Sequence, residues 1–289
     1  MRIDNTGLSS LLVTALLLVS ANSRAQDINK LNVHSKLDIS PLLREISGMC
    51  FDNNDIYALN DGGNGSYIFK LDIKTGELKE KFRIYNIRNK DWEELSIYGG
   101  YLYIGDFGNN AGTRNDLVIH RINIDSLNER QPPVLTAGME YLMQKEHGTS
   151  RQNNEWDCEA MVVNRDGILC FSKNRKDLIT RMYKVKLREN NVLSPVDSFY
   201  AGFLVTGAYY QSSVKSLYLC GYYKNDTYLL HFKNADNEGF SDDCVKYIIP
   251  ELKHTQVESV FVRGNYIYLA SERTMKNQTI YRILVSGLK

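Results

Sequence analysis

The chain has 289 residues, a length that suits one large all-β domain or two smaller domains. Apolar residues make up 43% of it and charged residues 24%, which is ordinary for a globular protein and excludes gross disorder. The 35 basic and 34 acidic residues give a net charge of +1, so nothing predicts a surface for nucleic acid or anionic membranes. The 19 tyrosines and 10 phenylalanines favour strands.

Residues 1–25 are typical of a secretory signal peptide. Arg2 stands near the start, an apolar stretch covers residues 11–19, and small residues precede Gln26. The apolar stretch is too short for a spanning helix, and neither a second such stretch nor a lipobox cysteine follows. An amphipathic first helix is the alternative. We therefore expect a secreted or periplasmic protein without integral membrane association, in which residues 26–289 form one domain.

One supersecondary unit recurs five times along the chain. Each copy opens with an apolar run and passes through a short polar turn into a second apolar run, which predicts a β-hairpin. The opening runs are residues 45–51, 91–97, 157–163, 204–210 and 256–262. A third alternating run follows in every copy, and the first four copies have a less regular fourth run at residues 77–84, 138–144, 194–200 and 244–249. Residues 31–39 supply the strand that the fifth copy lacks.

This arrangement predicts an all-β fold, a five-bladed β-propeller of four-stranded blades in which the N-terminal strand closes the last blade. A β-sandwich would also give short strands, but not this in-register repetition. Six blades are the alternative, because the span from residue 123 to residue 154 is long for a connection. We interpret that span as a loop, one strand and a polar connection, since it contains no hairpin of its own.

Acidic residues gather where the first strand of each blade begins, at the mouth of the predicted channel. One position read across the five copies gives Ser47, Glu93, Glu159, Thr206 and Glu258. Two residues earlier stand Glu45, Asp91, Asp157, Leu204 and Gln256. Side chains two apart on a strand share a face, so Asp91 with Glu93, and Asp157 with Glu159, are expected to point the same way. Acids at that density need a cation, a basic side chain or raised pKa values.

The ends of the second strands bring further groups to the same mouth. They add the oxygens of Asn60, Asp61, Asp106, Asn109, Asn110, Ser172 and Glu272 and the cations of Arg114, Lys173, Arg175 and Arg273. Three interpretations stay open: these groups pair with one another, hold a metal ion, or catalyse a reaction. Ca²⁺ suits oxygen-rich clusters, and its expected ligands are Asp91, Glu93, Asp157 and Glu159. The loop at residues 60–65 lacks EF-hand spacing and is interpreted as a polar turn.

Other residues that could carry chemistry are expected to be structural. Trp92, beside the carboxylates, is expected to pack between blades, with stacking on a ligand ring as the alternative. His120 and His231 fall within the third-strand pattern, and neither HExxH nor GxSxG occurs. The five cysteines match no zinc spacing, so we expect buried thiols on strands, with one disulfide as the alternative.

Six short motifs carry a family resemblance. They are EISG at residues 45–48, NDGG at 60–63, DWEEL at 91–95, YIGDFGNN at 103–110 with Arg114, DCEAM at 157–161 and TGA at 206–208. With them the chain resembles exported bacterial β-propeller proteins of largely uncharacterised type, related to the NHL-like and esterase-like-phytase propellers. The resemblance implies a propeller and an exported location. Calcium-dependent lactonase and gluconolactonase-type propellers look similar in holding a metal at the channel mouth with acidic and amide side chains, a pattern that Glu45 would fit.

Two functional hypotheses follow. The first is a non-enzymatic exported propeller, a binding or scaffolding module for a small molecule, glycan or protein, with a structural Ca²⁺ as an option in its channel. The alternative is a metal-dependent hydrolase of the lactone, phosphoester or glycoside class, in which Arg114, Lys173 and Arg273 would bind an anionic substrate. The candidate residues of the channel rim are Glu45, Asp61, Asp91, Glu93, Asp106, Asn109, Arg114, Asp157, Glu159, Lys173, Glu258, Glu272 and Arg273.

Overall fold

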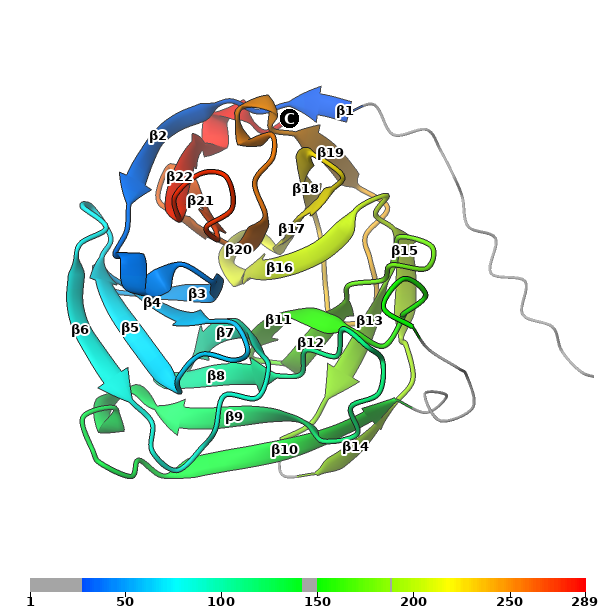
Figure 1. The fold of residues 1–289 in the computed structure, drawn as a ribbon. Coiled ribbons are helices and arrows are strands. Elements are labelled where there is room, and N and C mark those ends of the chain that lie inside the picture. The colour runs from blue at the N-terminus through cyan, green and yellow to red at the C-terminus, as the bar shows by residue number, and fades with distance from the viewer. Residues whose placement is uncertain (1–27, 142–149, 188) are drawn as a thin grey trace, which may run out of the picture.

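The computed structural model describes residues 28–141, 150–187 and 189–289, which form five β-sheets set as blades around a central channel (Figure 1). The prediction of an all-β, five-bladed β-propeller is confirmed. The inner strands contact one another in the closed order β3, β7, β11, β16, β20 and back to β3. The predicted signal peptide lies outside the described residues.

Each blade runs from an inner strand at the channel to an edge strand on the outside of the ring. Blade 1 contains β3 (Ile46–Asp52), β4 (Asp55–Asn60), β5 (Tyr67–Asp72) and β6 (Leu78–Arg83). Blade 2 contains β7 (Trp92–Tyr98), β8 (Tyr101–Asp106), β9 (Leu117–Asn123), β10 (Val134–Tyr141) and β14 (Asn190–Leu193). Blade 3 contains β11 (Cys158–Asn164), β12 (Gly167–Ser172), β13 (Ile179–Val185) and β15 (Asp197–Tyr200).

The last two blades contain the N-terminal strands. Blade 4 contains β16 (Leu204–Gln211), β17 (Ser216–Tyr223), β18 (Asp226–Phe232), β19 (Cys244–Ile248) and β1 (Ile28–Lys30). Blade 5 contains β20 (Val257–Arg263), β21 (Tyr266–Ser271), β22 (Thr279–Leu284) and β2 (Val33–Asp38). Single 3₁₀ turns lie at η1 (Pro41–Leu43), η2 (Ile124–Ser126), η4 (Ser212–Val214), η5 (Pro250–Leu252) and η6 (Val285–Gly287).

The ring is closed by a strand from the other end of the chain, as predicted. β2 pairs antiparallel with β22 and completes blade 5. The described part of the long span 123–154 contributes β10, which pairs with β9 in blade 2, so the five-blade interpretation holds. Two short edge strands were not predicted: β1 joins β19, and β14 joins β10, both in parallel. Each extends its blade at the outer edge and leaves the order of the inner strands around the channel unchanged.

All five inner strands carry a β-bulge at the same place. The register with the second strand shifts between Ile46 and Gly48, and likewise between residues 92 and 94, 158 and 160, 205 and 207, and 257 and 259. The skipped residues are Ser47, Glu93, Glu159, Thr206 and Glu258, the position that the sequence repeats align. A bulge re-aims side chains and interrupts the two-residue alternation. All five skipped residues are buried.

The core consists of clusters between neighbouring blades rather than one central core. Trp92 is 0% exposed and packs among apolar residues of blades 1 and 2, which include Leu59, Ile68 and Leu102. The expectation that Trp92 packs between blades is thereby confirmed. Inner strands such as β20 are buried on nearly every residue because both of their faces meet adjacent blades.

The histidines and cysteines singled out above have structural environments. His120 shares a hydrogen bond with Thr136 (2.9 Å), and His231 shares one with Ser216 (3.1 Å) and stacks on the Tyr218 ring. Four of the cysteines, Cys50, Cys158, Cys170 and Cys220, are buried free thiols on strands, and Cys244 lies half-buried on β19. The expectation of buried thiols on strands is confirmed for these four, and the disulfide alternative is not supported.

One buried carboxyl group joins the inner strands at the channel axis. Glu94 follows the bulge of β7 and is 1% exposed. Its Oε1 accepts from the backbone N–H of Leu95 (3.0 Å), and its Oε2 accepts from the backbone N–H of Ala208 in blade 4 (3.2 Å). The backbone of Met161 in blade 3 also donates to it. Burial raises the pKa of Glu94 well above its usual range, although these hydrogen bonds lower it.

The hydroxyl of Ser259 extends this network to the remaining blades. It lies 3.4 Å from Oε1 of Glu94, and it accepts from the backbone N–H of Met49 in blade 1 (2.9 Å). The position of Glu94 is small in the other four copies, where it is Gly48, Ala160, Gly207 or Ser259. A Cβ on Gly48 would lie 2.4 Å from the backbone nitrogen of Leu95, so blades 1 and 2 approach too closely there for a side chain.

We predict that Glu94→Ala lowers the free energy of unfolding by about 3 kcal/mol, because it leaves buried backbone donors from several blades unsatisfied and opens a cavity. Urea unfolding followed by tryptophan fluorescence measures this loss. The matched control is Glu80→Ala on the exposed surface of β6, which should cost under about 1 kcal/mol. Equal stability of the two variants would contradict the role given to Glu94.

Candidate functional site

The acidic channel mouth lies where the inner strands begin and the second strands end. Most of the candidate residues from the sequence meet there, because the bulged residues and the residues at the strand ends of several blades converge on one opening. Arg273 is the exception: its side chain is exposed and forms no ion pair with any described residue, although its backbone N–H donates to the carbonyl of Arg44. Glu45 lies at the edge of the mouth and accepts from the Asn64 amide (2.7 Å).

On the side of blade 3 the carboxylates are paired with bases. Asp157 is fully buried and forms an ion pair with Arg175, and it also accepts from the backbone N–H of Asn109 (2.7 Å). Glu159 forms an ion pair with Lys173. Burial lowers the pKa of Lys173, but the charges of Glu159 and of the other acidic groups around it together outweigh burial, and the pKa stands well above its usual range. In this sector the groups pair with one another, which is the first of the three interpretations.

Asp106 and Asn109 organise the loops of blade 2. Asp106 is buried, accepts from the backbone N–H of Asp91 (3.1 Å) and forms an ion pair with Arg114 (2.9 Å). The Asn109 amide donates to the Trp156 carbonyl (3.1 Å), and its oxygen accepts from the backbone N–H of Arg114 (2.8 Å). These contacts fix the loop that carries Arg114 against the start of β7. Both side chains therefore position the mouth rather than face into it.

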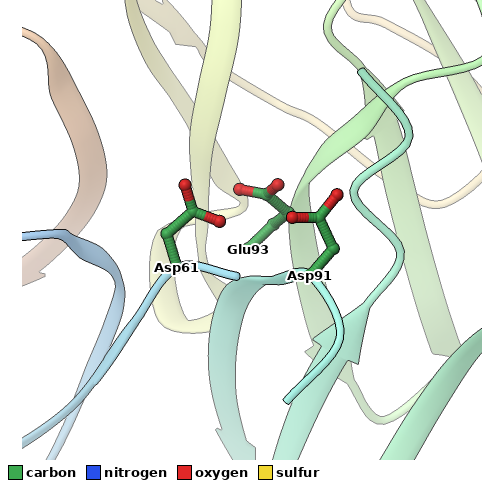
Figure 2. A group of neighbouring side chains, drawn as sticks. All are labelled: Asp61, Asp91 and Glu93. Carbon is green, nitrogen blue, oxygen red and sulfur yellow. The ribbon is translucent and has the colours of Figure 1, made fainter. Parts of the chain in front are cut away.

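A second group of acids is less closely paired with bases in the described part of the chain. Asp61 follows β4, Asp91 precedes β7, and Glu93 is the bulged residue of β7; their carboxylates turn toward one another (Figure 2). One oxygen of each lies within 4.8 Å of the others. The nearest guanidinium, that of Arg114, is 4.0 Å from Asp91. We call these three residues the acidic triad.

Glu93 is the least compensated member of the acidic triad. It is 5% exposed, and its Oε1 has no hydrogen-bond partner among the described residues. Two glycines leave room around these oxygens: a Cβ on Gly108 would lie 2.1 Å from Oε1 of Glu93, and one on Gly62 would lie 2.2 Å from Oδ1 of Asp91. A buried carboxylate oxygen without a donor is costly, so this is where a cation would stabilise the fold most.

The raised pKa values of the acidic triad are consistent with the weak compensation of its charges by bases. Burial, and then the charge of Asp61, raises the pKa of Asp91 to about 6. Burial, and then the charge of Glu159, raises the pKa of Glu93 well above its usual range. The pKa of Asp61 is raised mainly by burial as well. In the folded protein without a cation, these three carboxyl groups therefore keep protons at pH values at which an exposed carboxyl group would already be ionised.

Blade 5 closes the mouth with two further acids. Burial raises the pKa of Glu258 to about 7, although the charge of Lys173 lowers it. Burial, and then the charge of Glu258, raises the pKa of Glu272 to about 8. The Lys173 ammonium also lies 5.5 Å from the centre of the Tyr222 ring. The negative charges of Glu258 and Glu272 are therefore partly balanced by Lys173, less than those of the paired acids in blade 3 and more than those of the acidic triad.

The sequence pattern placed the acids and bases of the rim together but did not assign which acid pairs with which base. It assigned the metal to Asp91, Glu93, Asp157 and Glu159, whereas the structure gives Asp157 and Glu159 basic partners and brings Asp61 to the other two. The loop of Asp61 turns through Gly63, which has a positive φ of 77°, so the expected polar turn also delivers a carboxylate to the channel. The strand spacing carried no signal for that contact between blades.

Comparisons with known proteins agree on the fold. A model of the LVIVD repeat family matches residues 91–119 and 255–274, which cover inner parts of blades 2 and 5. No curated protein matches the sequence. Solved structures with a similar fold include an exo-β-1,3-galactanase from Clostridium thermocellum, with a TM-score of 0.52 and 10% identity over 89% of this chain and 61% of that one.

Two further similar structures have lower scores. One is a glucose dehydrogenase, with a TM-score of 0.47 and 7% identity over 86% of this chain and 99% of that one. The other is a putative gluconolactonase, with a TM-score of 0.46 and 8% identity over 84% of this chain and 75% of that one. At these identities the likeness concerns the propeller fold. Within the described part of the chain, no helix has the length and apolar character needed to cross a bilayer.

Proposed function

We propose that the protein is a propeller binding module that holds a divalent cation, Ca²⁺ by its ligand chemistry, at the acidic triad of Asp61, Asp91 and Glu93. The observation that carries this proposal is the buried Oε1 of Glu93, which has no hydrogen-bond partner within the described ranges of the chain and lies in a cluster with two further carboxylates. Three carboxylates provide up to six oxygens, and Ca²⁺ takes six to eight oxygen ligands in flexible geometry. The absence of histidine and cysteine from the triad disfavours zinc.

The cation would join two blades and leave coordination positions toward the channel mouth. Asp61 belongs to the turn between β4 and β5 of blade 1, and Asp91 and Glu93 belong to blade 2, so a shared ion would stabilise the junction of these blades. An oxygen-bearing ligand could complete the coordination. An exported location, which residues 1–25 predict, fits a weak site of the kind found in extracellular calcium modules.

We expect Ca²⁺ to bind the chelator-treated protein in isothermal titration calorimetry, and Glu93→Gln to weaken binding by at least about tenfold, because it removes a buried anionic ligand. Glu45→Gln is the matched control. It removes one acid from the same mouth but not from the triad, so its affinity should stay within about twofold of the wild type. No binding to the wild type, or an equal loss in both variants, would refute the site.

Calcium binding at the acidic triad should depend on pH. The raised pKa values of Asp91 and Glu93 mean that the metal-free fold is favoured below the usual carboxylate pKa, and that this stability is lost as pH rises through about 6 and above. Ca²⁺ needs deprotonated ligands, so its affinity should rise by at least about tenfold between pH 5.5 and pH 8. Thermal unfolding with Ca²⁺ or with chelator measures this, and the calcium-dependent rise in Tm should be larger at pH 8.

Glu93→Gln serves as the control for the pH series, because it should show little calcium-dependent rise at either pH. An equal rise at both pH values in the wild type would mean that the bound ion does not displace protons from the triad. That result would move the site to other, already ionised groups.

A metal-dependent hydrolase is the second candidate function, favoured by one observation. Glu258 lies in the same mouth with a pKa of about 7, which suits a general acid or base near neutral pH. If this proposal holds, a lactone, phosphodiester or aryl glycoside probe should turn over with Ca²⁺ present, and Glu258→Gln should lower kcat by about a hundredfold with little change in KM. The same Glu45→Gln control applies, and no turnover of any probe would exclude these classes.

A further inference from the structure

A pocket separate from the acidic triad lies beside the turn between β4 and β5, next to the junction between blades 1 and 2. It has a volume of about 300 Å³ and is lined by residues 63–67, 83–85 and 87–89. One wall is the turn from β4 to β5, and the other is the end of β6 with the segment that leads into β7. This volume stands at the lower end of small-molecule sites, so it suits a ligand of about one ring.

The walls of the pocket are fixed by hydrogen bonds. The backbone N–H of Asn89 donates to the Ser66 hydroxyl (2.8 Å), and the backbone N–H of Ile84 donates to the Ser66 carbonyl (2.9 Å). The Asn89 amide donates to the carbonyls of Asn60 and Asp61, at 3.0 Å each. The segment is also fastened by the Asn86 amide, which donates to Pro132 (2.8 Å). The pocket is therefore pre-formed, which lowers the entropic cost of binding.

Two arginines in this pocket carry uncommitted charge. Arg83 and Arg88 are exposed, and neither forms an ion pair with a described residue. By contrast, Arg114, Lys173 and Arg175 at the channel mouth all have acidic partners. The charge that faces this pocket is thus left for a ligand.

Aromatic rings hold one of these arginines in place. Arg83 lies over the Tyr85 ring at 4.6 Å, and Tyr67 is its partner across the strand pair β5–β6. Tyr85 is 56% exposed. A guanidinium stacked on an aromatic ring keeps its N–H edge free, and that edge matches a carboxylate in two parallel hydrogen bonds. The tyrosine rings offer flat apolar faces to the rest of a ligand.

We propose that this pocket binds a small ring-shaped carboxylate, with its carboxylate on Arg83 and Arg88 and its ring against Tyr85. An acidic sugar and an aromatic acid share this chemistry, and both fit the volume of the pocket. The site is separate from the acidic triad, because none of the three triad residues lines the pocket. Asn64 and Asn89, which do line it, donate to backbone carbonyls of residues 60–62. The site therefore does not depend on a bound cation.

The test is calorimetric titration of the full protein in chelator-containing buffer with galacturonate and with 4-hydroxybenzoate, beside their neutral counterparts galactose and phenol. At least one acid should bind at least about tenfold more tightly than its neutral counterpart, because the two arginines bind the carboxylate group, which the neutral compound lacks. Galacturonate alone would identify an acidic sugar, and 4-hydroxybenzoate alone an aromatic acid. Absence of binding by both acids at about 10 mM, or equal binding of the neutral compounds, would overturn the proposal.

Variants locate the binding. Arg83→Ala and Arg88→Ala should each weaken it by about tenfold. Arg121→Ala is the matched control, because Arg121 lies over Tyr101 at 4.4 Å on blade 2, away from the pocket, and it should change nothing. Acetate should bind far more weakly than either ring acid, and equal binding would remove the role of Tyr85. Glu93→Gln should leave ring-acid binding unchanged even if it abolishes Ca²⁺ binding, and loss of both would place the ligand in the channel instead.

Discussion

The hydrogen bonds of Glu94 at the channel axis are the constraint on which the arrangement of the blades depends. One carboxyl group accepts from the inner strands of blades 2, 3 and 4 and reaches blades 5 and 1 through Ser259. For it to fit, the equivalent positions in the other blades must be small, and Gly48 leaves no space for even a Cβ. The five repeated inner strands are therefore joined at the axis by Glu94, which is the one large side chain at a position that is small in the other four blades.

The same bulges that admit Glu94 to the axis also create the acidic mouth above it. A bulge turns the skipped residue toward the channel, and three of the five skipped residues are glutamates. The pairing of acids with bases then differs around the ring. Asp157 and Glu159 form close ion pairs with Arg175 and Lys173. Among the described residues, Arg114 reaches Asp91 only at 4.0 Å, and no base forms an ion pair with Asp61 or Glu93. The uneven pairing of acids with bases, rather than the density of acids, is what distinguishes the sector that we propose as the cation site.

The repeats predicted the blades well because each strand reports its own pattern of burial. The hairpins, the third strands and the closing strand at residues 31–39 lie where the alternation of apolar residues placed them. Strands β1 and β14 were missed because short edge strands with few buried residues carry little pattern. Glu94 was missed because the two-residue period fails at a bulge, although four small residues in register with one glutamate were a readable sign. The ion pairs of Arg175 join two loop ends of blade 3, and the contact of Asp61 with Asp91 and Glu93 joins blades 1 and 2. The spacing of residues within one strand reports neither kind of contact.

The closing strand β2 has a consequence for how the molecule resists opening. In an open row of blades each unit contacts only its neighbours, so terminal units can fray independently. The pairing of β2 with β22 removes the free ends from that row and covers an edge that would otherwise be open to pairing with another chain. Blade 5 is built from segments about 240 residues apart, and it cannot form until both have been made. We therefore expect the ring to close slowly during folding, and we expect no blade of the closed ring to unfold as a free terminal unit.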